Sequence, residues 1–380
     1  MHRVVIVGGG VGGMVSAHEL RRRLPADDQV VVIEQSSVHT FWPSLLWITG
    51  GTRKADQVTR RFSDLREKGI QVVHARVDAI DPEARTVRAG GQTFSGDAVI
   101  LSPGADLDPS LVPGLAAEAG DLYTVKGAES VHSRLAALTK GRVVVLVSRV
   151  PFKCPAAPYE AAMLIDGYLR QKHRRDAVQV EIWAAEPMPM GVAGPGVSEA
   201  VAAAVRDRGI AYHPSETVEK VNDGKLYMKG GQEVPYDLLA YVSPHVAPPV
   251  VVAAGLAPAG GWVQVNRETL ETSFPNVFAI GDVTGIGLLL GKPLPKAGTF
   301  AHRQAEAVAE TVARRLTGRG GDQKFYGVGE CFVEMGRSVA GFARGNFYHE
   351  PLPDVHVYKA GKHWHAAKVA FERHWWSQWW

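Results

Sequence analysis

The sequence predicts an α/β protein with two Rossmann-like dinucleotide-binding domains and a C-terminal segment that ends in an amphipathic helix. Three observations predict this class. A glycine-rich turn lies between an apolar run and a helical pattern at the start of the chain, a second strand–helix–strand pattern begins at residue 143, and a buried strand followed by a helix returns after residue 277. Strands that alternate with helical segments are typical of parallel sheets. The second unit is therefore expected to be inserted into the first.

The order of these patterns sets the expected domain boundaries. The first unit takes residues 1–110 and 265–320, the second takes residues 111–264, and a C-terminal domain takes residues 321–380. Strands are expected at residues 3–7, 30–33, 71–75, 85–87, 98–101, 143–147, 178–183 and 277–280, and helices at residues 11–24, 157–169, 197–208 and 299–316.

Composition excludes several classes of function. Hydrophobic residues make up 46% of the chain and charged residues 21%, as in soluble globular proteins. The net charge of +3, with no basic run interleaved with aromatics, disfavours nucleic-acid binding. No apolar run reaches the roughly 18 residues of a transmembrane helix, and the first apolar run enters the glycine turn directly, so no signal peptide is expected. The two cysteines lack partners at zinc-ligand spacing, so no metal is expected.

The first motif is a glycine-rich turn that reads G-G-G-V-G-G from Gly8. It follows a strand, opens a helix at Val11, and has Glu34 at the end of the next strand, which is the context that a dinucleotide-binding fingerprint requires. Gly8 permits the tight turn, Gly10 lets the backbone approach a pyrophosphate, and Gly13 lets helix and strand pack closely. The Glu34 carboxylate can accept a hydrogen bond from a ribose hydroxyl. FAD and NAD both fit this motif.

Two downstream segments favour FAD. The run from Ala98 to Ala105, with Ser102 and Gly104, looks like the segment that returns to the FAD site in flavin disulfide-reductase-like enzymes. The strand that ends in Gly281-Asp282 resembles their second FAD motif, in which the aspartate contacts the ribitol. The first domain is therefore predicted to bind FAD.

The second unit lacks a glycine motif for NAD(P). Its corresponding turn, from Val147 to Cys154, contains no glycine, and Pro151 removes a backbone donor. We expect that this unit does not cradle a pyrophosphate and that reducing equivalents reach the flavin without NAD(P)H.

Cys154 lies in that turn, just before a predicted helix. The helix N-terminus and the adjacent Lys153 are both expected to favour a thiolate. Cys331 lies far along the chain. Two unrelated buried cysteines are the alternative interpretation, since free cysteine is often a small core residue.

These residues carry a family resemblance over nearly the whole chain. The sequence resembles sulfide:quinone oxidoreductases and the flavoprotein subunit of flavocytochrome c sulfide dehydrogenases, most specifically at residues 152–160, 295–298 and 368–372 and at Cys331. Type II NADH dehydrogenases are more distant and keep the second glycine turn. The resemblance and the motifs together give the expected FAD-binding set: Gly8, Gly10, Val11, Gly13, Glu34, Gln35, Trp42, Pro43, Val77, Ser102, Gly104, Gly281, Asp282, Lys296, Ala297 and Gly298.

The resemblance implies a mechanism. Cys154 and Cys331 would form a disulfide or sulfur bridge that sulfide attacks, leaving a persulfide on one sulfur. The freed thiolate would attack the flavin ring, two electrons would pass to FAD, and quinone would reoxidise it. Lys296 would lie close to the flavin and stabilise its reduced, anionic form. Many family members have a third cysteine, which this chain lacks, so FAD is expected to be non-covalent, or at least not tethered through cysteine.

The C-terminal helix carries an aromatic line. Its members recur every four residues, at Ala367, Phe371, Trp375 and Trp379, and are flanked by Trp376 and Trp380. Tryptophans on an amphipathic helix suit the membrane–water interface, so we expect a peripheral, monotopic attachment to the cell membrane. A helix docked on the protein's own surface, or on a partner in a homo-oligomer, is the alternative.

Three other functions fit the same residues. They are a related flavoprotein that reduces a cytochrome, a flavin-binding sensor or scaffold without turnover, which the cysteine pair disfavours, and a type II NADH dehydrogenase, which the glycine-free turn disfavours.

Overall fold

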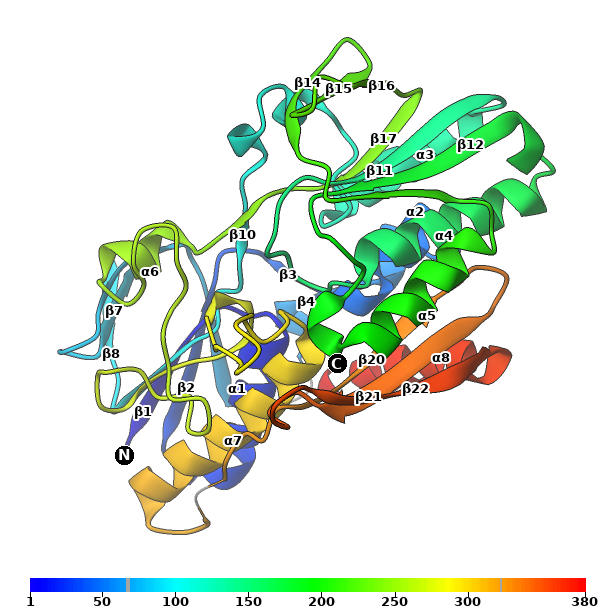
Figure 1. Cartoon of the computed structure of the whole chain (residues 1–380). Coiled ribbons are helices and arrows are strands. Elements are labelled where there is room, and N and C mark those ends of the chain that lie inside the picture. The colour runs from blue at the N-terminus through cyan, green and yellow to red at the C-terminus, as the bar shows by residue number, and fades with distance from the viewer. Residues whose placement is uncertain (66–68, 322) are drawn as a thin grey trace.

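The structure is a computed structural model that describes residues 1–65, 69–321 and 323–380. Two parallel sheets lie side by side, and a smaller antiparallel sheet with a long helix closes the remaining side (Figure 1). The chain leaves the first sheet, builds the second, and returns to complete the first, as the sequence predicts.

The first sheet has five parallel strands in the order β19-β9-β1-β2-β5. They are β1 (Arg3–Val7), β2 (Gln29–Glu34), β5 (Ile70–His74), β9 (Ala98–Leu101) and β19 (Val277–Ala279). Helices α1 (Val11–Arg23) and α7 (Gly298–Thr317) pack on one face. The other face meets α6 (Pro249–Ala253) and the antiparallel strands β6 (Val77–Asp81), β7 (Thr86–Ala89) and β8 (Gln92–Ser95). Because both faces are covered, the strands are continuous apolar runs.

The second sheet has four parallel strands in the order β13-β12-β11-β17. They are β11 (Gly141–Val147), β12 (Val178–Ala184), β13 (Ala211–Pro214) and β17 (Leu238–Val242). Its helices are α3 (Val125–Ala137), α4 (Ala157–Gln171) and α5 (Pro195–Arg206), and an antiparallel sheet follows with β14 (Val218–Asn222), β15 (Lys225–Met228) and β16 (Glu233–Pro235). The ribbon of β10 (Asp106–Leu107) and β18 (His245–Val246) marks the two crossings between the sheets.

The C-terminal part is a three-stranded antiparallel sheet followed by a helix. Its elements are β20 (Val328–Glu334), β21 (Ala340–Asn346), β22 (Asp354–Gly361) and α8 (Lys362–Trp379). Near α8 lie β3 (Val38–Thr40), α2 (Leu45–Thr49) and β4 (Thr59–Arg61) from the first part of the chain.

The aromatic line of α8 corrects one expectation. Trp375 and Trp379 are 2% and 1% exposed and belong to the same core cluster as α1 and α7. Trp379 contacts His18 of α1, with ring centroids 4.5 Å apart, and Trp375 stacks on His39. These two side chains therefore complete the protein's own core and do not meet a membrane. The regular apolar spacing reflects burial against the first domain.

The predicted helices and strands are all present, with ends shifted by a few residues. The first helix ends at Arg23 because Leu24, before Pro25, is extended. The strand expected from Arg85 begins at Thr86, since Arg85 has a left-handed φ of 52°. In the linker expected at 318–322, Gly318 ends α7 with a φ of +71°, and residue 322 lies outside the described residues. Across the described residues, no helix has the length and apolar character needed to cross a bilayer.

Candidate active site

The glycine turn is shaped for close approach of backbone to a ligand. Gly8 has a φ of +95°, and a Cβ there would lie 2.3 Å from the carbonyl oxygen of Ser102. A Cβ on Gly13 would lie 1.9 Å from the carbonyl oxygen of Gly8, so helix and turn could not pack as they do. A Cβ on Gly10 would meet nothing within 4 Å, which leaves open space at the turn. That space suits the pyrophosphate of a dinucleotide.

Glu34 lies at the end of β2, next to the turn. Its carboxylate accepts hydrogen bonds from the backbone N–H of Gly9, at 2.6 Å, and of Ser36, at 2.7 Å. These two bonds fix the carboxylate where a ribose hydroxyl is expected. Gln35 follows on the exposed side, and Val77, half-buried, begins β6.

The ends of β9 and β19 bring the downstream motifs to the same edge. Ser102 is buried directly after β9, and Gly104, with a φ of +78°, has open space around it. Gly281, with a φ of +73°, follows β19, and its N–H donates to the side chain of Gln304 on α7. Burial raises the pKa of the neighbouring Asp282, while Lys153 and Lys296 oppose that shift.

Lys296 is buried beside Asp282. Its ammonium donates to the backbone carbonyls of Asp282, at 2.6 Å, and Thr284, at 2.9 Å, and lies 3.4 Å from the ring centroid of Trp262. Burial lowers the pKa of Lys296 to about 8, although Asp282 acts to raise it. Ala297 caps α7, and Gly298 begins it.

The donor groups in this region fit FAD. Neither α1 nor α7 has a side-chain cap or an acidic residue in its first turn, so their N-terminal N–H groups are not engaged by side chains. Helix N-termini carry partial positive charge and attract the anionic parts of such a cofactor. Residues 8–13 and Glu34 would hold its diphosphate and ribose, and Asp282, Lys296 and the start of α7 would lie toward its other end.

The two cysteines and Lys296 line one cavity. Its volume is about 320 Å³, and most of the lining side chains are apolar, among them Phe152, Met188 and Phe347. Cys154 lies between β11 and α4, and Cys331 lies in β20, so two distant segments supply the thiols. Both cysteines are free and half-buried.

The Cys154 loop is attached to the Lys296 loop. The backbone N–H of Cys154 donates to the carbonyl oxygen of Lys296 at 2.6 Å, and Cys154 has a left-handed φ of 49°. A non-glycine residue held in that region stores strain that surrounding contacts must hold in place, and such residues cluster at functional sites. The bond places the sulfur-bearing loop of the second unit next to the ammonium-bearing loop of the first.

The prediction that Cys154 is a thiolate is wrong. Burial raises the pKa of the Cys154 thiol to about 12, and Glu160 adds to the shift. Burial also raises the pKa of Cys331 well above its ordinary value, with Cys154 as the next cause. Lys153, which was expected to stabilise a thiolate, instead lies over the ring of Trp42, and burial lowers its pKa against the opposing charges of Asp282, Asp121 and Asp106. Loss of hydration therefore outweighs the helix N-terminus.

Sequence reasoning missed a buried acid–base pair beside the cysteines. The ammonium of Lys368 on α8 donates to the carboxylate of Glu160 on α4, 208 positions away, and both side chains are buried. Burial raises the pKa of Glu160 to about 7, with Lys368 opposing. Burial alone would lower the pKa of Lys368, but Glu160 and Glu334 outweigh it and raise that pKa. Both residues lie in segments that carry the family resemblance, which was the available signal.

Trp42 and Pro43 of the expected FAD-binding set lie in a short 3-10 turn. Trp42 is 41% exposed, and Pro43 follows it in the same turn. The Lys153 ammonium lies 5.1 Å from the Trp42 ring centroid and 5.7 Å from that of Tyr123, whose hydroxyl donates to the Lys153 carbonyl. In the part of the chain that the structure describes, no group of three or more His, Cys, Asp or Glu could hold a metal ion.

The chain is similar to known flavoproteins over almost its full length. Residues 2–148 and 158–305 match the family model described as pyridine nucleotide-disulphide oxidoreductase, and residues 128–185 match that of the central part of the sulfide dehydrogenase [flavocytochrome c] flavoprotein chain.

Individual relatives agree with the family models. The sulfide-quinone reductase of Aquifex aeolicus is 27% identical over 98% of this chain and 89% of its own, and the mitochondrial sulfide:quinone oxidoreductase of Mus musculus is 25% identical over 92% and 79%. The X-ray structure of the sulfide:quinone oxidoreductase from Aquifex aeolicus has a TM-score of 0.89 at 26% identity, covering 98% of this chain and 90% of that one.

Proposed function

This chain belongs to the pyridine nucleotide-disulphide oxidoreductase family, in its branch of sulfide:quinone oxidoreductases and flavocytochrome c sulfide dehydrogenase flavoproteins, and on that premise we propose that it oxidises sulfide with Cys154 and Cys331 and passes the electrons through FAD to quinone. The observation that carries the proposal is the shared cavity. Two cysteines from distant segments and Lys296 line one space of about 320 Å³.

The sulfur chemistry needs a bridge between the two cysteines. Hydrosulfide attacks one sulfur of a Cys154–Cys331 bridge, so that a bond forms between the incoming sulfur and one cysteine while the bridging bond breaks. The other cysteine leaves as a thiolate. When the bridge re-forms with one more sulfur, the pair gives up two electrons and the proton of the persulfide. Repetition lengthens the sulfur chain to a polysulfide, and the mostly apolar cavity has room for it.

The protein's own groups handle protons in this scheme. Both cysteine thiols have raised pKa values because they are buried, so a departing thiolate takes a proton readily. Glu160 has a pKa of about 7 and is a cause of the pKa shift at each cysteine, which places its carboxyl near both. It can therefore hold a proton close to them at neutral pH.

Bound FAD would supply the two-electron acceptor that links the cysteine pair to quinone. Both cysteines are used by sulfur chemistry, and the chain has no third one, so we propose that FAD is held without a cysteine tether. Lys296 contributes a positive charge beside the predicted flavin position. The turn from Val147 to Cys154 carries no pyrophosphate cradle, so we propose that NAD(P)H is not the donor.

Quinone is lipid-soluble, so the proposal includes a peripheral position on the membrane. With Trp375 and Trp379 buried, the surface that supports it is an aromatic cluster at the C-terminal sheet. The aromatic cluster consists of Phe332, Phe342, Tyr358, Trp364 and Phe371. Each of these rings contacts at least one other ring of the cluster, and Tyr358 and Phe371 are each 39% exposed. Exposed aromatic side chains of this kind suit the interface between lipid and water.

The test is anaerobic bleaching of the flavin absorbance. Sulfide alone is expected to bleach the FAD-loaded protein, and a short-chain quinone is expected to restore the absorbance. Cys154→Ser and Cys331→Ser should each slow bleaching by on the order of a thousandfold or more, because neither variant can form the bridge. Bleaching by NADH, or sulfide reduction that survives both substitutions, contradicts the cysteine mechanism. An Arg206→Gln variant, on the exposed face of α5, serves as the control.

The match at residues 128–185 supports one alternative acceptor. That segment matches the flavocytochrome c sulfide dehydrogenase flavoprotein chain, so a cytochrome could take the electrons in place of quinone. Stopped-flow reoxidation of sulfide-reduced protein separates the two: quinone is expected to reoxidise it rapidly, and fast reoxidation by a c-type cytochrome with no response to quinone would favour the alternative.

A further inference from the structure

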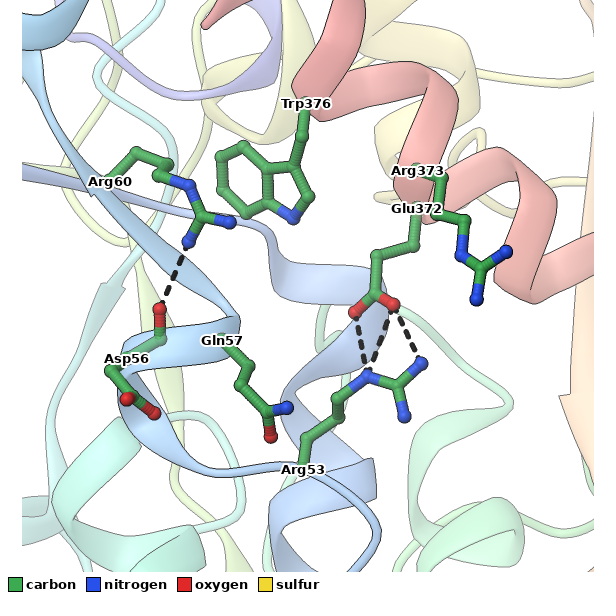
Figure 2. A pocket seen from close by; sticks show the side chains of 7 residues that line it. All are labelled: Arg53, Asp56, Gln57, Arg60, Glu372, Arg373 and Trp376. Carbon is green, nitrogen blue, oxygen red and sulfur yellow. Dashed lines mark hydrogen bonds and ion pairs between the residues drawn. The ribbon is translucent and has the colours of Figure 1, made fainter.

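A second cavity lies beside α8, and Glu372, Arg373 and Trp376 of that helix line it. It has a volume of about 430 Å³, and Figure 2 shows the side chains that line it. We call it the arginine pocket, and its lining residues are Arg53, Asp56, Gln57, Arg60, Glu372, Arg373 and Trp376. Neither cysteine and no residue of the predicted FAD set lines it. It is therefore separate from the site described above.

Arg60 presents a positioned guanidinium to the pocket. One of its terminal nitrogens donates to the carbonyl oxygens of Asp56, at 2.9 Å, and Thr59, at 2.7 Å, and its Cζ atom lies 4.6 Å from the ring centroid of Trp376. Among the described residues, its hydrogen-bond acceptors are backbone oxygens and no carboxylate pairs with it, and Figure 2 shows the Asp56 carboxylate pointing away from it. The side chain is thus fixed in place while its charge is not neutralised.

The other two arginines of the pocket, Arg53 and Arg373, differ in whether a carboxylate neutralises them. Arg53 is neutralised, because it donates three hydrogen bonds to the Glu372 carboxylate, the shortest at 2.7 Å, and lies over the Trp47 ring. Arg373, the next residue of α8, is exposed, and within the described part of the chain it has no hydrogen-bond or ion-pair partner. The Arg53–Glu372 pair, with Arg53 half-buried and Glu372 buried, is therefore neutral overall, and Arg60 and Arg373 supply two cations without an ion-pair partner among the residues that the structure describes.

The surrounding surface is also cationic. Lys54 and Arg61 are exposed on the same segment, so residues 53–61 carry four basic side chains and one acidic one. Guanidinium groups match phosphate oxygens in geometry as well as in charge. α8 itself carries the half-buried indole of Trp376, which lines the pocket, and the exposed ring of Phe371 one residue before Glu372. Aromatic side chains of this kind are enriched at membrane surfaces.

We propose that the arginine pocket binds the phosphate of an anionic phospholipid headgroup and thereby orients the protein on the bilayer. The inference rests on the membrane position in the proposed function and names the lipid that supports it. A soluble phosphate has the same charge, but the aromatic side chains beside the pocket favour a phosphate that belongs to a lipid. The attraction falls off within a Debye length, so binding is expected to weaken as salt rises.

The experiment is co-sedimentation of the FAD-loaded full chain with vesicles. Vesicles of phosphatidylcholine alone are compared with vesicles that also contain phosphatidylglycerol, for the wild type and for Arg60→Gln/Arg373→Gln. The wild type is expected to prefer the anionic vesicles, and the double variant to lose that preference by on the order of tenfold or more. The matched control is Arg88→Gln/Arg206→Gln, which removes the same charge from exposed sites elsewhere and should lose far less.

Two results overturn the proposal. One is equal binding to both kinds of vesicle, or equal loss in the control variant. The other is protection against thermal unfolding by soluble glycerol 3-phosphate without any preference for anionic vesicles, which would assign the pocket to a free anion. Sulfide oxidation with a short-chain quinone in lipid-free buffer is measured on the same samples. This activity should be unchanged in the double variant. If the wild type has no sulfide oxidation activity, the proposed function is wrong, but the vesicle-binding result still stands.

Discussion

Lys296 joins the sulfur chemistry to the predicted flavin position. Its backbone carbonyl accepts from Cys154, and its ammonium is held by the carbonyls of Asp282 and Thr284. Neutral carbonyls orient the ammonium without cancelling its charge, so a positive charge remains available to a neighbouring anion. Its pKa of about 8 means that this charge is present at neutral pH and is lost as the pH rises through 8.

Lys296→Met is expected to lower the midpoint potential of bound FAD. Loss of one close charged contact, at roughly 1.5–3 kcal/mol, corresponds to roughly 30–60 mV for a two-electron couple. In the wild type the stabilisation of the reduced, anionic form is present below about pH 8 and fades above it, so the potential should fall more steeply there. The variant should lack that extra slope.

Dye-coupled redox titration from pH 6 to 9 checks this. Lys292→Met is the matched control, because Lys292 lines the same cavity but is exposed. An unchanged potential in Lys296→Met would show that its ammonium does not act on the flavin.

Glu186 is a second buried carboxyl on the cysteine cavity. It follows β12, it is 9% exposed, and the hydroxyl of Tyr159 donates to it. Burial raises its pKa to about 7, although the bond from Tyr159 opposes the shift. A carboxyl whose pKa is higher in the folded state favours folding below its unfolded pKa, near 4.5, and that contribution is lost as the pH rises through about 7.

Glu186→Gln should therefore stabilise the protein at pH 8 relative to the wild type, by up to about 3 kcal/mol, and have little effect at pH 5. Glutamine keeps an acceptor for Tyr159 and cannot ionise. Urea unfolding at both pH values measures the difference. Glu219→Gln, on an exposed strand position, should follow the wild type at both. A variant that is destabilised at pH 8 would mean that the carboxylate is charged in the folded state without penalty.

At the scale of elements, α8 supports the glycine turn through one histidine. His39 is 2% exposed, and its ring lies against those of Trp375 and Trp380, with centroids 5.6 and 4.8 Å away. Burial lowers its pKa to about 4, so the ring is neutral, and its Nδ1 donates to the carbonyl oxygen of Gly9 at 2.9 Å. The N–H of Gly9 in turn donates to Glu34. The last turns of α8 therefore hold the peptide that begins the predicted FAD site.

Replacement of Trp375 and Trp380 by alanine is expected to weaken FAD binding by on the order of tenfold or more, since each 1.4 kcal/mol lost from the bound state is tenfold in the dissociation constant. The recovery of flavin fluorescence on dilution measures this constant. Trp183→Ala removes a buried tryptophan from the second sheet, where it stacks on His213, and controls for general destabilisation. If Trp183→Ala weakens FAD binding by the same factor, the effect is general destabilisation and α8 does not specifically stabilise the glycine turn.

At the scale of the whole molecule, local patterns predicted the fold and distant contacts did not follow from them. The glycine turn, Glu34 and the strand before Gly281 were recognisable because their roles depend on neighbours a few residues away. The pair of Glu160 and Lys368 was not, because nothing local in the sequence connects residues 208 positions apart. The predicted roles of the site residues stay predictions.

Two errors have one physical cause, which is burial. The helix N-terminus beside Cys154 predicts a thiolate only while the sulfur keeps its hydration, and the structure removes it. The tryptophans of α8 have the same spacing whether the apolar face meets lipid or the protein's own core. Sequence periodicity identifies an apolar face but does not name what covers it.

The strand order also determines which parts of the fold can form first during translation. The first sheet begins with β1, but β19 at its edge and α7 on its face are synthesised only after the whole four-stranded sheet has been made. The inserted unit can therefore close while its host is still missing a strand. The histidine that holds the Gly9 carbonyl receives its tryptophan cover later still, from residues 375–380. During translation, the earliest motif to emerge is thus among the last to become complete.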